Sequence, residues 1–300
     1  MKLGDNNGSY ILHDEGCLEK QIELLYENFI DNNVRYAEVR CSPYNYATKR
    51  NSGKDILDFI VDSINRQMVK HEHKCHVNLL IIATRNKSSK YIERNLDLAV
   101  NYVDENQEPN ACKVVGVDLA GYENIETRPG YFESDFEIVH RKGLDITIHA
   151  GENDEAEGIW EAIYKLNTRR IGHGLNLYQD KNLVRSVVNR KIGVEMCPYA
   201  NYQIAGFIPM KGKKRKYPLL DYLNAGIQVC INTDNIGISD AGITDNFMLL
   251  TKLNPGITRM QILRLIRNGI LQAFVQYKFR INMLRSFNKD IFDLLLNKNF

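Results

Sequence analysis

The segment Leu144-Asp145-Ile146-Thr147-Ile148-His149-Ala150-Gly151-Glu152 ends an apolar run with a histidine and places a carboxylate three residues later. The β-branched residues before His149 predict a strand, and Gly151 predicts a turn directly after it. Such an arrangement puts a metal-type ligand beside a proton carrier. A single histidine at a strand end is more often a structural residue, so this segment needs support from the rest of the chain.

Other apolar runs end in polar residues in the same way. Arg170-Ile171-Gly172-His173-Gly174 holds a histidine between two glycines, which allow other groups to approach closely. Val229-Cys230-Ile231-Asn232-Thr233-Asp234-Asn235 ends in a carboxylate beside an amide. Residues 114–121, 35–40 and 192–198 follow the same pattern. Residues with chemical function therefore gather where successive strands finish.

The strand-like runs alternate with helical patterns, which predicts a parallel sheet covered by helices. Seven strands are expected near residues 35–40, 77–83, 113–120, 144–149, 169–172, 192–197 and 227–232. The spacing is that of an α/β barrel of the triosephosphate isomerase type, (β/α)8, in which the carboxyl ends of the strands form the active-site mouth. We expect residues 1–300 to form one such domain, with a helical extension over residues 275–300.

An eighth strand is missing from this count, and the front of the chain is where it is expected. Residues 1–10 are polar and rich in turn-forming residues, and the first helical pattern spans about residues 18–29, before the strand that begins at Tyr36. The sequence therefore predicts a barrel that is incomplete at its N-terminus.

Five of these segments together resemble the signature blocks of the adenosine deaminase family, the metal-dependent aminohydrolases of adenosine and related purines. They are His-Ala-Gly-Glu at 149–152, Arg-Ile-Gly-His-Gly at 170–174, Asn-Thr-Asp at 232–234, Val-Gly-Val-Asp-Leu-Ala-Gly at 115–121 and Tyr-Ala-Glu-Val-Arg-Cys-Ser-Pro at 36–43. The resemblance extends from about residue 33 to residue 274. It implies a metal-dependent hydrolase barrel with one divalent ion, usually zinc, whose bound water attacks the purine carbon that carries the amino group.

The resemblance also implies roles for individual residues. His149 and Asp234 match metal ligands, and Asp234 also orients the attacking water. Glu152 matches the residue that protonates the purine ring, and His173 matches the one that steers the hydroxide.

Two further positions match substrate contacts. Gly121 matches a glycine whose backbone amide meets the purine. Asn235 stands where an aspartate is common, and an amide both donates and accepts hydrogen bonds where a carboxylate only accepts. The substitution leaves room for a purine nucleotide or a modified purine as substrate.

The family's first strand supplies two further metal ligands as a His-x-His pair, and no such pair precedes Tyr36. His13 stands alone, and His71-Glu72-His73 precedes a strand, at the end opposite the mouth, so solvated histidines are expected there. With His149 and Asp234 alone, zinc would have two side-chain ligands where a catalytic site has at least three. We therefore expect this chain by itself to hold zinc weakly and to be impaired or inactive in catalysis.

Three functions remain open. The first is hydrolytic deamination of adenosine, or of AMP or ATP as the deaminase domain of a larger protein. The second is a purine-binding or regulatory module that has lost its metal. The third is a hydrolase of cyclic amides, which usually carries a bridging lysine and a second metal. An upstream domain or a homo-oligomer would supply what the barrel lacks, since an incomplete barrel leaves two unpaired edges.

Composition narrows the setting. The 39 basic and 37 acidic residues give a net charge of +2, which favours neither nucleic acid nor membrane as a partner. The six cysteines are scattered without a disulfide framework or a Cys-x-x-Cys pair. No apolar run approaches the roughly 20 residues that span a bilayer and no leader is visible, so a cytoplasmic setting is expected. The basic run at 211–216 is read as a solvated loop, with contact to a phosphate or an acidic partner as the alternative.

Overall fold

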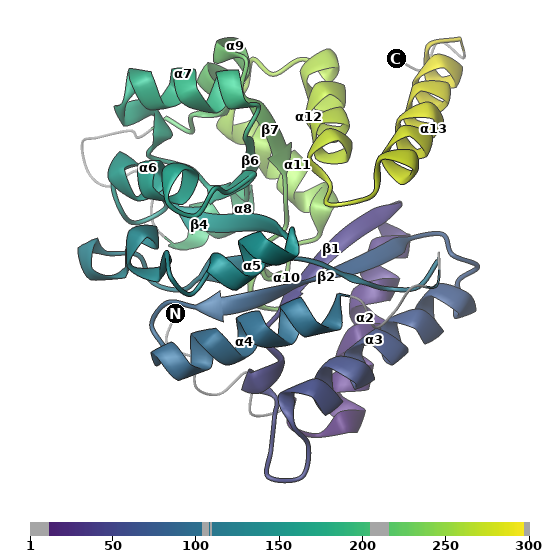
Figure 1. The fold of residues 1–300 in the computed structure, drawn as a ribbon. Helices are drawn as coiled ribbons and strands as arrows, with labels where there is room; N and C mark the ends of the chain where they lie inside the picture. Colours follow the sequence, from purple (N-terminus) through teal and green to yellow (C-terminus); the bar gives the residue numbers. More distant parts are fainter. Residues whose placement is uncertain (1–11, 104–107, 109, 205–215, 297–300) are drawn as a thin grey trace.

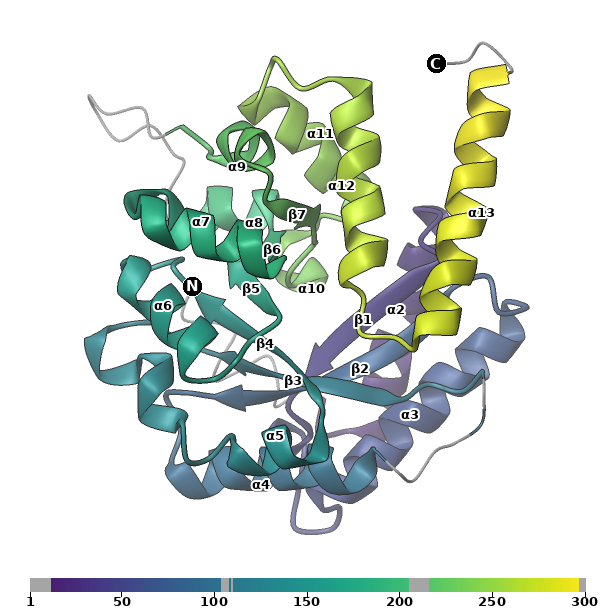
Figure 2. The same cartoon turned by 45° about the horizontal axis from the view of Figure 1, so that its top comes forward.

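The computed structural model describes residues 12–103, 108, 110–204 and 216–296. Its centre is one parallel sheet whose seven strands lie side by side in chain order. The strands are β1 (Tyr36–Cys41), β2 (His76–Thr84), β3 (Val114–Ala120), β4 (Asp145–Ala150), β5 (Arg170–His173), β6 (Gly193–Met196) and β7 (Gln228–Ile231). The seven predicted strands are confirmed, each to within a few residues. Figure 2 shows the sheet curling as in a barrel of the triosephosphate isomerase type.

Helices alternate with the strands (Figure 1). They are α2 (Glu15–Asp31), α3 (Gly53–Lys70), α4 (Ser89–Tyr102), α5 (Glu137–Lys142), α6 (Ala156–Tyr164), α7 (Lys181–Arg190), α8 (Pro198–Ile204), α9 (Leu219–Ala225), α10 (Ile236–Ser239), α11 (Ile243–Leu253), α12 (Arg259–Gln272) and α13 (Tyr277–Leu296). Helices such as α3, α4 and α12 lie along the outer face of the sheet (Figure 1). Among the described helices, none combines the length and the hydropathy that crossing a membrane would require.

The central strands are buried on both faces, as a sheet covered by helices requires. In β2, Leu79, Leu80 and Ile81 are all fully buried although successive side chains point to opposite faces. The edge strand β1 differs, because only Cys41 of its six residues is buried. All six cysteines are free thiols, and five of them are buried. The five buried cysteines pack as small apolar side chains.

Within the described residues, β1 and β7 are the two edges of the sheet, and they do not pair with each other. Helix α12 packs along β7, whereas α13 diverges from α12 and lies near the start of β1 (Figures 1 and 2). An ion pair of 2.8 Å between Arg35 and Asp290 ties α13 to the residue that precedes β1. The barrel is therefore open on the side between β7 and β1.

The amino-terminal end of the sheet is closed by the connection between α12 and α13. Phe274 is 2% exposed, and its ring centroid lies 3.4 Å from the guanidinium carbon of Arg170. Its backbone N–H donates to Oε1 of Glu38, at 2.6 Å. This contact joins the last helices to β1 across the open side, at the end of the strands opposite the mouth.

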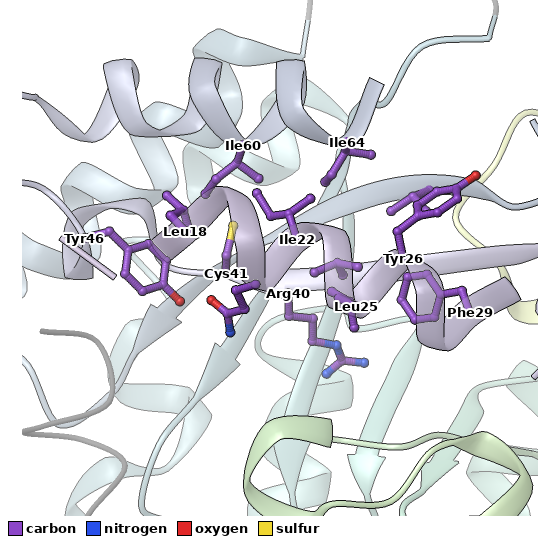
Figure 3. Close-up of a pocket in the computed structure, with 13 residues that line it drawn as sticks. Leu18, Ile22, Leu25, Tyr26, Phe29, Arg40, Cys41, Tyr46, Ile60 and Ile64 are labelled. Carbon is purple, nitrogen blue, oxygen red and sulfur yellow. The ribbon is translucent and has the colours of Figure 1, made fainter. Parts of the chain in front are cut away.

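A small cavity of about 90 Å³ lies beneath α2, beside the free edge of β1. Leu18, Ile22, Leu25 and Phe29 of α2 line it, and Figure 3 shows the Arg40 guanidinium pointing away from these apolar side chains. The cavity is too small and too apolar for a purine nucleoside, since ligand sites usually enclose about 300 Å³ or more. The cavity is therefore not a purine site, and the residues predicted as functional lie instead at the carboxyl ends of the strands.

Candidate active site

His149 stands at the end of β4 with its ring orientation fixed. Its Nδ1 donates to the Asp118 carboxylate, on β3, at 3.0 Å. Asp118 is fully buried, and the imidazole is 19% exposed. Because Nδ1 carries the shared proton, Nε2 is the nitrogen left to bind another group. A carboxylate behind a histidine in this way is the usual support of a metal-ligating imidazole.

Asp118 itself belongs to a buried chain of alternating charges. Arg40, on β1, donates to Asp118 at 2.7 Å and to Glu195, on β6, at 2.5 Å. Arg170 forms an ion pair with Glu195 at 2.7 Å and another with Glu38 at 2.6 Å. Each buried charge therefore has a partner of opposite sign, which is the condition for tolerating charge inside a protein.

This chain of charges sets the protonation of the two residues at its end. Burial alone would raise the pKa of Asp118, yet the neighbouring His149 and Arg40 hold it well below its usual range. Burial alone would lower the pKa of His149, but the Asp118 carboxylate raises it to about 9. The metal-free imidazole is thus a cation at neutral pH. A metal ion at Nε2 would have to displace that proton.

Glu152 lies beside the two histidines on the turn after β4. Its side chain is 11% exposed, and Oε1 lies 3.5 Å from Nδ1 of His173. Oε1 is buried and has no hydrogen-bond partner among the described residues. The rings of His149 and His173 are 4.9 Å apart. The structure therefore brings together His149, Glu152 and His173, three residues that the sequence predicts as functional.

A side-chain network fixes the tautomer of His173. Its Nδ1 accepts from the amide nitrogen of Asn201 at 2.9 Å. The amide orientation follows from the other end of Asn201, where Oδ1 accepts from the Cys197 N–H at 3.2 Å and from the Tyr217 hydroxyl at 3.0 Å. The neutral ring of His173 therefore carries its proton on Nε2.

Two of the candidate residues have a backbone conformation that side chains disfavour. His173 has φ of +64° and Asp234 has φ of +56°. Strain of about 1–3 kcal/mol per residue is expected there, and such strain concentrates at functional sites. Gly172 has a different role, because a Cβ there would lie 3.3 Å from the Cα and Nδ1 of His149. The sequence prediction that glycine allows close approach is correct at this position.

Asp234 follows β7 and is exposed. Its charge contributes to raising the pKa of His149, so it faces the same cluster. Asn235 is also exposed, and its side-chain oxygen accepts from the Ile238 N–H at 3.1 Å, which caps the short helix α10. Gly121, at the end of β3, has φ of +104°, which favours glycine. The predicted substrate contacts of Asn235 and Gly121 stay predictions.

The predicted zinc site is incomplete in the described part of the chain. His149 and Asp234 offer the nitrogen and oxygen donors that zinc accepts. Nevertheless, the described residues contain no group of three His, Cys, Asp or Glu side chains placed to hold a metal ion. The donor chemistry fits zinc, but two donors do not make a catalytic site, so the residues present do not fit the ion by themselves.

Sequence reasoning did not assign a role to the residues that support this cluster. Asp118, Arg40, Glu195 and Asn201 lie in or after apolar strands. The sequence does mark Asp118, Arg40 and Glu195, because each is a charged residue near the end of an apolar run. Which of them form ion pairs with one another depends on the register of the sheet. Asn201 carries no such signal, because only the fold brings it to His173.

A parallel barrel-type sheet with histidines and carboxylates at the carboxyl ends of its strands is the architecture of a barrel enzyme, whose active site lies at that end. The adenosine deaminase family model matches residues 15–289. The adenosine deaminase of Clostridium acetobutylicum is 30% identical over 274 residues, which are 90% of this chain and 76% of that protein. The chain therefore belongs to the adenosine deaminase family and is an aminohydrolase, and its relatives support deamination of purines.

Solved structures agree on the fold. An amidohydrolase from Burkholderia ambifaria with bound Zn has a TM-score of 0.78 at 20% identity, covering 95% of this chain and 75% of that one. The apo N6-methyl-AMP deaminase from Arabidopsis thaliana has a TM-score of 0.73 at 20% identity, covering 92% of this chain and 79% of that one. At this level of identity, the likeness establishes the barrel architecture and leaves the substrate open.

Proposed function

We propose that the protein hydrolyses adenosine, or a related adenine nucleoside or nucleotide, to the inosine form with release of ammonia. The observation that carries this proposal is the position of Glu152, a largely buried carboxyl group whose Oε1 lies 3.5 Å from Nδ1 of His173 and has no hydrogen-bond partner among the described residues. A carboxyl group that takes a proton from the attacking water and donates it to a nitrogen of the purine ring makes the neighbouring ring carbon a better electrophile. The family to which the chain belongs supports the same reaction.

Each residue of the cluster has a distinct role in this proposal. Glu152 transfers a proton to the ring nitrogen next to the attacked carbon. His173, with its proton on Nε2, donates a hydrogen bond to the attacking oxygen and orients it. Asp234 accepts a hydrogen bond from the same oxygen, and the backbone amide of Gly121 contacts the purine ring.

We also propose that zinc is held by His149, Asp234 and two donors from outside the described residues. Zinc bound there would lower the pKa of water to near 7 and would so supply a nucleophile at neutral pH. The supporting observation is that Asp118 holds the His149 ring with Nε2 directed away from the support. The Burkholderia ambifaria amidohydrolase, with the same fold, has bound Zn.

The experiment measures zinc content and ammonia release with adenosine, AMP, N6-methyl-AMP and ATP as substrates. It uses this chain and a version extended at its N-terminus by a strand with a His-x-His pair. We expect stoichiometric zinc and ammonia release in the longer protein, and weak zinc and slow release in the shorter one. Zinc in the longer protein without ammonia from any purine would contradict the proposal.

A second function, purine binding without turnover, is favoured by one observation. The described residues contain no group of three His, Cys, Asp or Glu side chains placed to hold a metal ion. A purine-binding module without turnover would bind inosine or IMP in calorimetry whether or not zinc is present. The catalytic proposal expects zinc to be needed for turnover in the longer protein.

A further inference from the structure

Glu123 lies in the loop after β3 and is 3% exposed. Its Oε2 accepts from three consecutive backbone N–H groups, those of Glu152 at 3.1 Å, Asn153 at 3.3 Å and Asp154 at 3.2 Å. A single carboxylate oxygen therefore holds the backbone of residues 152–154, the turn that carries Glu152, the proposed proton donor. Hydrogen bonds to an ionised carboxylate are among the stronger ones in proteins.

The same turn is held from its other sides. The carbonyl of Gly151 accepts from the Asn176 N–H at 2.9 Å, and the carbonyl of Asp154 accepts from the Asn176 side chain at 2.7 Å. The Asp154 carboxylate accepts two hydrogen bonds from Arg128, at 2.7 and 3.1 Å. The N–H groups of the turn therefore point to Glu123, while Asn176 and Arg128 hold its carbonyl groups and the side chain of Asp154.

A buried cation joins this loop to the strand ends. Arg85 is 4% exposed and donates to the carbonyl of Leu119 at 3.0 Å and to that of His149 at 2.5 Å. Burial lowers the pKa of Arg85, and Glu123 is the foremost of the charges that oppose this shift. Glu123 thus lies within electrostatic reach of the residue that fixes the ends of β3 and β4.

We propose that Glu123 is a positioning residue, which holds Glu152 at the distance from the substrate that proton transfer requires. The proposal rests on the proposed function for its consequence in catalysis. Glu123 acts through the backbone of residues 152–154 and does not touch the substrate. Without it, the turn loses the one acceptor that its three N–H groups share, and one of those groups, that of Asp154, is buried.

A displacement of about 1 Å in a reacting group can slow catalysis about 100-fold. We therefore expect Glu123→Ala to lower kcat by about 100-fold and to change KM by less than about threefold. Glu123→Gln keeps one oxygen that can accept, so it should restore part of the loss. Glu126→Gln is the matched control, because Glu126 is exposed in the same loop and should leave kcat unchanged.

Hydrogen exchange of the backbone amides provides a readout that does not depend on activity. In Glu123→Ala the amides of residues 152–154 should exchange faster, while those of β4 keep their protection. Unchanged exchange at these amides would overturn the proposal even if activity fell. Equal loss of protection throughout the domain would also overturn it, because that result indicates a structural role.

Failure of the proposed function and failure of the positioning role of Glu123 give different results. If the zinc-loaded longer protein deaminates no purine, the proposed function fails, and the exchange experiment still tests whether Glu123 holds the turn. If it does deaminate a purine and Glu123→Ala retains full kcat, only the positioning role fails.

Discussion

The two sides of the cluster at the carboxyl ends of the strands differ in how many contacts hold their side chains. This cluster is formed by His149, Glu152, His173, Asp234 and Asn235. On the side of β4 and β5, His149 and His173 have buried partners, and a shared acceptor holds the turn of Glu152. On the side of β7, Asp234 and Asn235 are exposed, next to an edge of the sheet that is unpaired within the described residues. The first side is held by hydrogen bonds among the described residues, whereas the second is exposed.

This contrast separates the two halves of the proposed chemistry. The residues that would move a proton and orient the attacking oxygen are already in place. The residues that would complete the metal site are not all present among the described ones. We therefore expect substitutions on the β4–β5 side to change catalysis and stability strongly, and substitution of the proposed substrate contact Asn235, on the β7 side, to have a smaller effect.

The largest expected effect compares the two sides directly. His173→Ala should lower kcat of the zinc-loaded protein by about 100- to 1000-fold, because it removes a fixed hydrogen-bond donor to the developing charge. Asn235→Ala should change KM by about tenfold at most, since its side-chain oxygen caps α10 and the residue is exposed. Steady-state kinetics with adenosine and AMP measures both. Equal losses of kcat in the two variants would contradict the contrast.

The next effect concerns stability. Arg40→Met should lower the free energy of unfolding by about 3–5 kcal/mol, because it leaves Asp118 and Glu195 buried without their shared cation. The control is Arg35→Met, which removes an exposed ion pair with Asp290 and should cost less than about 1 kcal/mol. Urea unfolding at pH 7 measures the two values. A loss in Arg40→Met no larger than that of the control would show that the buried network does not stabilise the fold.

A smaller effect is expected from overpacking between β4 and β5. Gly172→Ala places a methyl group 3.3 Å from the backbone and ring of His149, which should cost about 1–3 kcal/mol and move the imidazole. Gly256→Ala is the matched control, because a Cβ there meets nothing within 4 Å. Thermal unfolding and zinc affinity of the longer protein check this. Wild-type zinc affinity in Gly172→Ala would show that the strands can separate without disturbing His149.

The smallest expected effect is a pH dependence of the stability that the Asp154–Arg128 ion pair gives to the turn that carries Glu152. Burial alone would raise the pKa of Asp154, but its hydrogen bonds with Arg128 lower the pKa below the ordinary value of 3.8. The stabilisation by this pair is therefore present above pH 3.8 and is lost as the pH falls through the lower folded value. Asp154→Asn should lose about 1 kcal/mol at pH 7 and less in acid. A loss that grows on acidification would contradict this sign.

Much of the fold could be predicted from the sequence, because its strands are short apolar runs and its helices have three-and-four spacing. The first helix extends further than predicted, from Glu15 to Asp31 rather than over about residues 18–29, because Asp14 caps its N-terminus and polar residues continue it. The extension after residue 275 is helical from Tyr277 to Leu296. The basic run at 211–216 lies outside the described residues, except for Lys216, which pairs with Asp221.

The cluster could be predicted only in part. His149, Glu152 and His173 carry local motifs, and β4 and β5 are neighbours that pair His149 with Gly172. Asp118, Asn201 and Glu123 could not be assigned, because their roles depend on distances between loops and strands that are 28 to 31 residues apart in sequence. No local pattern records which carboxylate lies behind which histidine.

The most direct test of the β4–β5 side as the centre of proton transfer is the rate of ammonia release from adenosine by the zinc-loaded longer protein and its Glu152→Gln variant. The variant keeps the shape of the side chain and removes the proton that it donates. We predict a loss of about 100- to 1000-fold with zinc content unchanged, and no loss in Glu157→Gln, an exposed glutamate on α6. Release at the wild-type rate in Glu152→Gln would contradict the assignment.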